Sequence, residues 1–119
     1  MPSNIEVVEA YLNGLRKRDM SDAPLLNNVV FENPLGGTLQ GKHNVIRFIN
    51  AYLPMMNEVR VLRHIAEGDH VATLWEAITP FGTLTLFQMF TIENESIKEL
   101  RSFYDPREFL ESMGTHGGN

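Results

Sequence analysis

Helical periodicity dominates the first half of the chain. Over residues 3–18, apolar side chains recur every three or four positions, which is typical of an amphipathic helix. Ser3 and Glu6 have the spacing of a capping box at its start. A second, short helix is predicted from Asp19 to Asn27 and a third over residues 42–53, where Pro54 ends the apolar stripe.

Extended patterns occupy the rest of the chain. A short strand is predicted over residues 28–32, stopped by Asn33-Pro34 and two glycines in the stretch FENPLGG. From residue 58 the period changes to two, and short turns separate four predicted strands: residues 58–66, 70–79, 83–92 and 96–104. A last short helix is predicted to begin at Asp105, followed by a disordered tail over residues 114–119.

Three helices followed by a curved, mainly antiparallel sheet of four or five strands predict one α+β domain over residues 1–113. In the strand 83–92, one face carries Gln88 among large apolar residues, and the opposite face carries Phe87 and Met89. The helices can cover only one face of the sheet. A homodimer is therefore predicted through the face of Phe87 and Met89.

Composition narrows the classes of partner. Fifteen acidic against ten basic residues give a net charge of −5, and the scattered cations do not form the patch that nucleic acid requires. No apolar run is long enough to span a membrane. The four histidines show no ligand spacing, so neither a metal nor another cofactor is expected. The absence of cysteine excludes disulfides and is compatible with the cytoplasm, where we expect the protein.

Three segments carry a family resemblance. VVEAYLNGLRKRD resembles the first helix, and FENPLGGTLQGKHNVIRF the strand, turn and third helix, of the nuclear transport factor two-like superfamily in its SnoaL-like and ketosteroid isomerase-like group. SIKELRSFYDPREF resembles the last strand and C-terminal helix, especially as in limonene-epoxide hydrolase. The resemblance implies a cystatin-like cone, with N-terminal helices on the concave face of the sheet and an apolar pocket between them.

The resemblance also assigns positions for isomerase chemistry. Tyr11 falls where ketosteroid isomerases have a tyrosine donor, Asn33 where they have the carboxylate base, and Gln88 where they have a protonated aspartate. An amide does not take up a proton near neutral pH, so the isomerase mechanism is in doubt, whereas hydrogen bonding by Tyr11 and Gln88 is not. His64 is the one evident alternative base, and a surface or core histidine is its plainer interpretation.

Epoxide hydrolase activity does not fit the resemblance. Its Asp, Arg and Asp positions are occupied by Trp75, Ala77 and Ser102, none of which can activate water for that reaction. Each remaining position has a structural alternative: Asn33 as a turn residue, Tyr11 and Trp75 as core, Met56 as ordinary packing. The residues expected to contact a substrate are Phe31, Tyr52, Met56, Trp75, Phe90, Ser102 and Tyr104.

These observations support three hypotheses. The first is an isomerase- or cyclase-like enzyme for a small oxygenated hydrophobic molecule, of steroid, terpenoid or polyketide type. The second is a module that binds such a molecule without catalysis, and the third is a structural dimer whose pocket is filled by its own side chains. The expected register places no carboxylate inward, which favours binding, although a shift by one residue would turn Glu76 or Glu99 inward.

Overall fold

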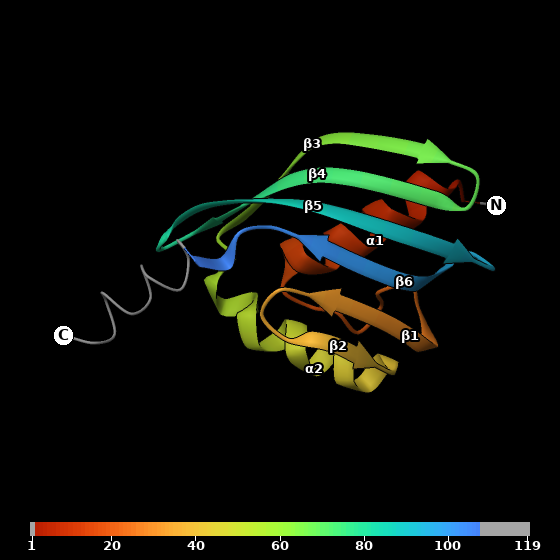
Figure 1. The fold of residues 1–119 in the computed structure, drawn as a ribbon, viewed down its shortest axis with the longest axis horizontal. Coiled ribbons are helices and arrows are strands. Elements are labelled where there is room, and N and C mark those ends of the chain that lie inside the picture. The colour runs from red at the N-terminus through yellow and green to blue at the C-terminus, as the bar shows by residue number, and fades with distance from the viewer. Residues whose placement is uncertain (1, 108–119) are drawn as a thin grey trace.

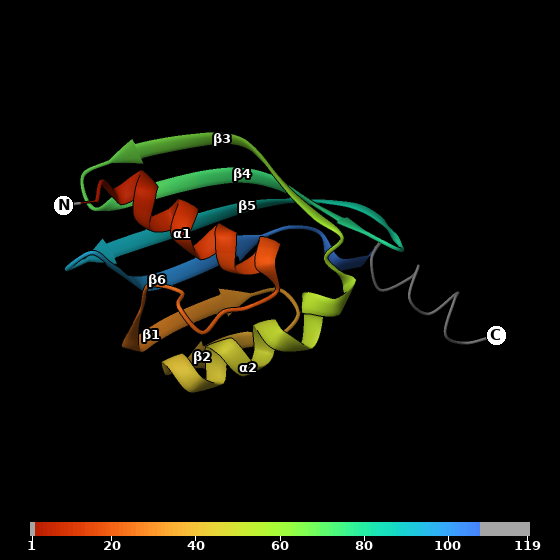
Figure 2. The same cartoon turned by 180° about the vertical axis from the view of Figure 1, so that it is seen from behind.

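A computed structural model describes residues 2–107 and has the predicted α+β architecture. Two helices, α1 and α2, lie on one side of a curved sheet of six strands (Figure 1, and from behind in Figure 2). The elements are α1 (Asn4–Lys17), β1 (Leu25–Asn33), β2 (Gly37–Gln40), α2 (Lys42–Tyr52), a 3-10 turn (Leu53–Met55), β3 (Glu58–Glu67), β4 (His70–Thr79), β5 (Gly82–Glu93) and β6 (Ser96–Phe103).

The predicted capping box starts α1. The Ser3 hydroxyl accepts a hydrogen bond from the Glu6 backbone N–H at 3.1 Å, and the Glu6 carboxylate accepts one from the Ser3 backbone N–H at 3.0 Å. The helix ends at Arg18, whose backbone has a left-handed conformation (φ 58°). The Arg18 backbone N–H donates to carbonyl oxygens of the last turn. Its apolar stripe is buried against the concave face of the sheet.

The helix predicted from Asp19 to Asn27 is wrong. The Asp19 carboxylate accepts hydrogen bonds from the Ser21 backbone N–H and hydroxyl, which closes a turn in place of a helix cap. From Leu25 onward the chain is already strand β1, because Leu25 pairs with Ile97 of β6. Proline disfavours the helical conformation for the residue before it, so Pro24 separates the turn from the strand.

FENPLGG forms the turn of a hairpin between β1 and β2. The strand β2 was not predicted from the sequence. The Asn33 side-chain oxygen accepts hydrogen bonds from the backbone N–H groups of Leu35 (3.0 Å) and Gly36 (2.6 Å). Residue 36 must be glycine, since a Cβ there would lie 2.7 Å from the Phe48 ring. The chain therefore reverses tightly, and Asn33 pairs with Gly37.

The sheet has the strand order β2-β1-β6-β5-β4-β3. Strands β3 to β6 form the predicted antiparallel meander, whereas β1 joins β6 in parallel, so the sheet is mixed. Along β5, Leu86, Gln88 and Phe90 point inward and are buried, as predicted. The predicted C-terminal helix lies largely, and the tail wholly, outside the described residues. Within residues 2–107, no helix is long and apolar enough to cross a membrane.

A polar chain ties α1 to the sheet. His64 of β3 lies between Thr73 of β4 (Nδ1 to Oγ1, 2.8 Å) and Glu9 of α1 (Nε2 to Oε1, 2.7 Å). The other Glu9 oxygen lies 3.3 Å from Arg16. Burial raises the pKa of the Glu9 carboxyl, but the hydrogen bonds from His64 and Arg16 outweigh it and hold the pKa below its ordinary value.

We expect Glu9→Gln to lower the free energy of unfolding by about 0.5 kcal/mol near neutral pH, the order of a partly exposed ion pair. A carboxyl whose folded pKa is depressed stabilises the fold above its unfolded pKa, about 4.3. The difference between wild type and variant should therefore shrink as the pH falls from about 5 toward 3. Urea unfolding at several pH values measures it, with the exposed Glu67→Gln as control; a difference independent of pH would contradict the assignment.

Candidate functional site

A cavity of about 80 Å³ lies between the helices and the concave face of the sheet. Every layer of the fold contributes to its lining. The helical side supplies Tyr11, Leu15, Phe48, Ile49, Tyr52, Met55 and Met56, and the sheet with its turns supplies Phe31, Leu35, Trp75, Ala77, Thr79, Leu84, Leu86, Gln88, Ser102 and Tyr104. Most of these side chains are apolar, and within the described part of the chain none of the lining residues is Asp, Glu, His, Lys or Arg.

Gln88 organises the closed end of this cavity. It is only 2% exposed, and its side-chain oxygen accepts a hydrogen bond from the Trp75 indole N–H at 2.8 Å. Its Nε2 donates to the Ser102 hydroxyl oxygen at 2.7 Å. The indole nitrogen can only donate, which fixes the orientation of the amide. The three residues come from three neighbouring strands, β4, β5 and β6.

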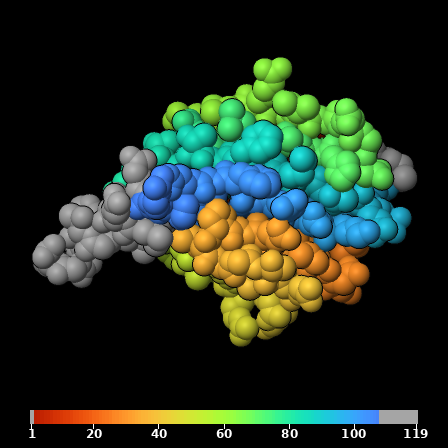
Figure 3. All heavy atoms as spheres, viewed as in Figure 1, coloured from red at the N-terminus to blue at the C-terminus, as the bar shows by residue number. Residues whose placement is uncertain are grey.

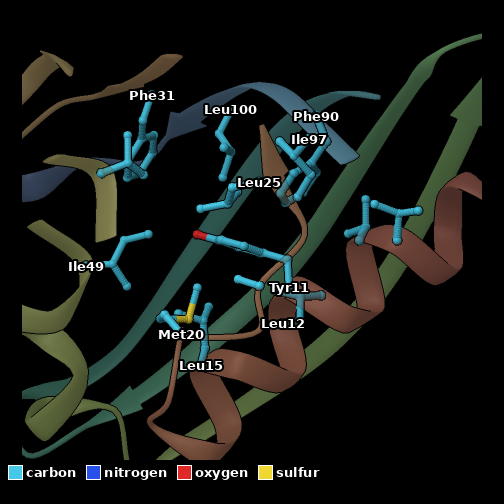
Figure 4. Packing of buried hydrophobic residues seen from close by; sticks show 14 of the residues in the cluster. Tyr11, Leu12, Leu15, Met20, Leu25, Phe31, Ile49, Phe90, Ile97 and Leu100 are labelled. Atoms are coloured by element: carbon cyan, nitrogen blue, oxygen red, sulfur yellow. The ribbon is translucent and has the colours of Figure 1, made fainter. Parts of the chain in front are cut away.

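Tyr11 completes the polar end from the opposite layer. Its ring extends from α1 toward Ile49 of α2, with the hydroxyl at the far end (Figure 4). Burial raises the pKa of the Tyr11 phenol well above its usual range, and a hydrogen bond with the Gln88 side chain partly opposes this. The Tyr11 hydroxyl therefore lies beside the Gln88 amide at the polar end of the cavity.

The other end of the cavity is lined by half-exposed side chains, including Tyr52, Met55, Met56 and Tyr104. The Tyr52 ring is in contact with Phe48, with centroids 5.1 Å apart. Burial, and secondarily the neighbouring Tyr52, raise the pKa of Tyr104 to about 12, so the Tyr104 phenol is neutral at physiological pH. The opening is therefore aromatic and flexible at its methionines.

Three of the residues predicted for the site do not line the cavity. His64 is held between Glu9 and Thr73, and Phe90 packs behind Tyr11, with ring centroids 5.5 Å apart. Asn33 faces inward at the end of β1, but its oxygen is used by the turn, and its Nδ2 is buried with no hydrogen-bond partner among the described residues.

The other predicted site residues are brought together at the cavity. They are Tyr11, Phe31, Tyr52, Met56, Trp75, Gln88, Ser102 and Tyr104. The register also places Glu76 on the outer face, where its carboxylate lies 3.4 Å from Arg60, and opposes Glu99 to Thr91 of the outer face of β5. Within residues 2–107, neither Glu76 nor Glu99 therefore turns inward to replace the amides at Asn33 and Gln88.

Sequence reasoning missed part of the lining. Leu84 and Leu86 lie on the face of β5 that carries Gln88, so the alternation in this strand already pointed to them. Phe48 and Ile49 were assigned to the buried side of α2 without a role in a site. Leu35 gave no signal, because its position depends on the turn that Asn33 closes.

The family model described as "Domain of unknown function (DUF4904)" matches residues 2–115. The chain belongs to this family. No curated protein matches the sequence of this DUF4904 protein at a significant level.

Solved structures share the fold of the DUF4904 protein. A protein from Kribbella flavida DSM 17836 is 17% identical with a TM-score of 0.87, and the match covers 95% of each chain. An NTF2-like protein from Burkholderia pseudomallei K96243 is 24% identical with a TM-score of 0.76, covering 93% of this chain and 97% of that one. A steroid delta-isomerase from Pseudomonas aeruginosa is 19% identical with a TM-score of 0.75, covering 99% and 94%. The nuclear transport factor two-like fold expected from the sequence is confirmed.

Substitution of Gln88 should show how much its hydrogen bonds contribute to the free energy of unfolding. We expect Gln88→Leu to lower the free energy of unfolding by about 2 kcal/mol, since the Trp75 N–H is left buried without an acceptor. In a Trp75→Phe background the same substitution should cost about 1 kcal/mol less, because that N–H is gone. Urea unfolding of the four proteins measures the coupling, with the exposed Gln40→Leu as control. Strictly additive effects would contradict the network.

Proposed function

We propose that this DUF4904 protein binds a small, neutral, apolar molecule that carries a hydrogen-bond acceptor, and that it does so without catalysis. The observation that carries the proposal is an apolar cavity with hydroxyl groups at its buried end and no Asp, Glu, His, Lys or Arg among the described lining residues. Concave, mostly apolar sites with a few placed polar groups are the usual form of small-molecule sites.

The hydrogen-bond directions favour an acceptor on the ligand. The Gln88 oxygen accepts a hydrogen bond from Trp75, and its Nε2 donates to the Ser102 hydroxyl oxygen. The Ser102 hydroxyl proton is then available to a third group, and the Tyr11 hydroxyl lies at the same end of the cavity. A carbonyl oxygen in the cavity would accept from the Ser102 hydroxyl, whereas a ligand without an acceptor would leave that proton unpaired in an apolar space.

The isomerase alternative is less well supported. A general base must lie within about 3 Å of the proton that it removes, or reach it through one water. Asn33 is an amide, lies outside the cavity lining and uses its oxygen in the turn, and His64 is held by Glu9 and Thr73. Tyr11 could polarise a carbonyl, but nothing beside it would accept a proton.

Thermal unfolding against a panel of steroids, terpenoids, phenols and fatty acids tests the binding proposal. A ligand that binds only the folded state stabilises it by about 2.7 kcal/mol at a hundredfold excess over its dissociation constant, so the unfolding midpoint should rise. Ala77→Leu, which adds atoms at a lining position, should abolish the shift in a protein that still unfolds cooperatively. No shift with any class would instead support a filled core and a structural role.

We also propose that two copies of the chain pair through the outer face of the sheet. Figure 3 shows this face uncovered by helices. Five side chains of β3 to β6 form an outer patch: Ile65, Leu74, Phe87, Met89 and Phe103. Four of them are large exposed apolar residues, with exposures of 54% (Ile65), 38% (Phe87), 38% (Met89) and 48% (Phe103).

Charges beside the outer patch favour a second copy over a charged partner. Arg101 is paired with Glu32 at 3.1 Å, and Arg60 with Glu58 at 2.8 Å and Glu76 at 3.4 Å. These two arginines are already paired within the chain, so an acidic partner would gain little from them. A second copy would bring the same apolar centre and the same neutralised edges, as an isologous interface requires.

Light scattering at micromolar concentration should give twice the chain mass of 13.5 kDa. Phe87→Glu places an unpaired charge in the outer patch and should shift the mass to that of one chain, with an unchanged circular dichroism spectrum. Thr83→Glu introduces the same charge on the same face of β5, outside the patch, and should leave the dimer intact. A wild-type mass of one chain would refute the pairing.

A further inference from the structure

The dimensions of the cavity limit the ligand more closely than its polarity does. Its volume is about 80 Å³. For comparison, an apolar protein cavity of about 150 Å³ takes up benzene, and sites for drug-sized ligands measure roughly 300–1,000 Å³. A fused four-ring skeleton therefore exceeds the space available. One ring requires a cavity roughly twice as large, a widening to which the unbranched side chains of Met55 and Met56 can contribute at the open end.

The walls of the cavity favour a flat ring. Six aromatic residues contribute to the lining: Tyr11, Phe31, Phe48, Tyr52, Trp75 and Tyr104. Three of them are already in edge or tilted contact, with centroids 5.9 Å apart for Phe31 and Phe48 and 5.1 Å apart for Phe48 and Tyr52. A planar ring can join this arrangement through the same edge-to-face and offset contacts.

The charge and hydrogen-bond directions set the functional group. With no Asp, Glu, His, Lys or Arg among the described lining residues, an ionised ligand would be desolvated without a counter-charge. The Ser102 oxygen accepts from Gln88, so its proton calls for an acceptor at the closed end, where the Tyr11 hydroxyl also lies.

We infer that the ligand is a neutral compound with a single planar ring that carries a carbonyl oxygen, as in an aryl ketone or a cyclic enone. This inference rests on the proposed binding function and narrows it. The ring occupies the aromatic part of the cavity, and the carbonyl oxygen accepts hydrogen bonds at the closed end. Multi-ring steroids exceed the volume of the cavity, and hydrocarbons of the same shape as the single-ring ligand bind less well because they leave a hydroxyl proton at the closed end unsatisfied.

A matched pair of probes tests the inference. Acetophenone and ethylbenzene differ mainly in the carbonyl oxygen, and androst-4-ene-3,17-dione supplies carbonyls on a four-ring skeleton. Titrations followed by amide nuclear magnetic resonance shifts should show acetophenone binding about three- to tenfold more tightly than ethylbenzene, the effect of a net hydrogen bond. The steroid should cause no saturable shift at residues of the cavity.

Variants separate the donors from the shape of the cavity. Tyr11→Phe removes a hydroxyl and keeps the ring, and it should lower the acetophenone affinity toward that of ethylbenzene. Ser102→Ala should do the same to a smaller extent if both hydroxyls reach the carbonyl. A circular dichroism melt of each variant verifies that it is folded, and Ala77→Leu, which fills the cavity, should abolish binding of both single-ring probes.

The outcomes distinguish this inference from the proposed function. Equal affinities for acetophenone and ethylbenzene, or tighter binding of the steroid than of acetophenone, would overturn the single-ring carbonyl inference while leaving the binding function in place. The single-ring carbonyl inference also fails if acetophenone does not bind but another class of the panel does. If neither these probes nor any compound of the panel binds, the binding function itself fails.

Discussion

The register of the central strands depends on the buried amide of Gln88. Gln88 lies among apolar residues in the middle of β5, where an unsatisfied amide would cost several kcal/mol, roughly 1–3 for each lost partner. Its partners Trp75 and Ser102 come from the strands on either side. A slip of one residue in any of these strands would turn one member of the network to the outer face. The need to satisfy this amide therefore fixes the register of three strands and places the polar end of the cavity.

In this register, the two faces of β5 carry different groups of side chains. On the outer face, the rings of Phe87 and Phe103 lie with their centroids 6.5 Å apart. The residues next to them along the strands, Gln88 and Ser102, form a hydrogen-bonded pair on the inner face. Most sheets with one exposed face are polar there, but this one is apolar on both. The proposed ligand site and the proposed subunit contact would thus lie on opposite sides of one strand pair, so neither would obstruct the other.

The period-two pattern predicted the meander and the inward position of Gln88, because a strand's alternation is a local property that a sequence records directly. The helix predicted for the segment after α1 was wrong for the opposite reason. Whether residues 19–27 become helix or strand depends on the pairing of Leu25 with Ile97, more than seventy positions away. Asn33 lies between these cases: its turn role is local, but its exclusion from the cavity follows from how Phe48 packs against Gly36.

This chain is similar in fold to a steroid delta-isomerase, so the chemistry of its cavity depends on which side chains line it. Polarising a carbonyl requires a donor, and Tyr11 remains at the buried end. Moving a proton requires a base as well. Asn33, at the position of the isomerases' base, is an amide whose oxygen is engaged in its own turn, and His64, the alternative base, is held by Glu9 and Thr73. The described lining therefore offers donors without a carboxylate or histidine, which is the arrangement on which the proposed binding function rests. A shared fold therefore does not determine function, which depends on the individual side chains of the site.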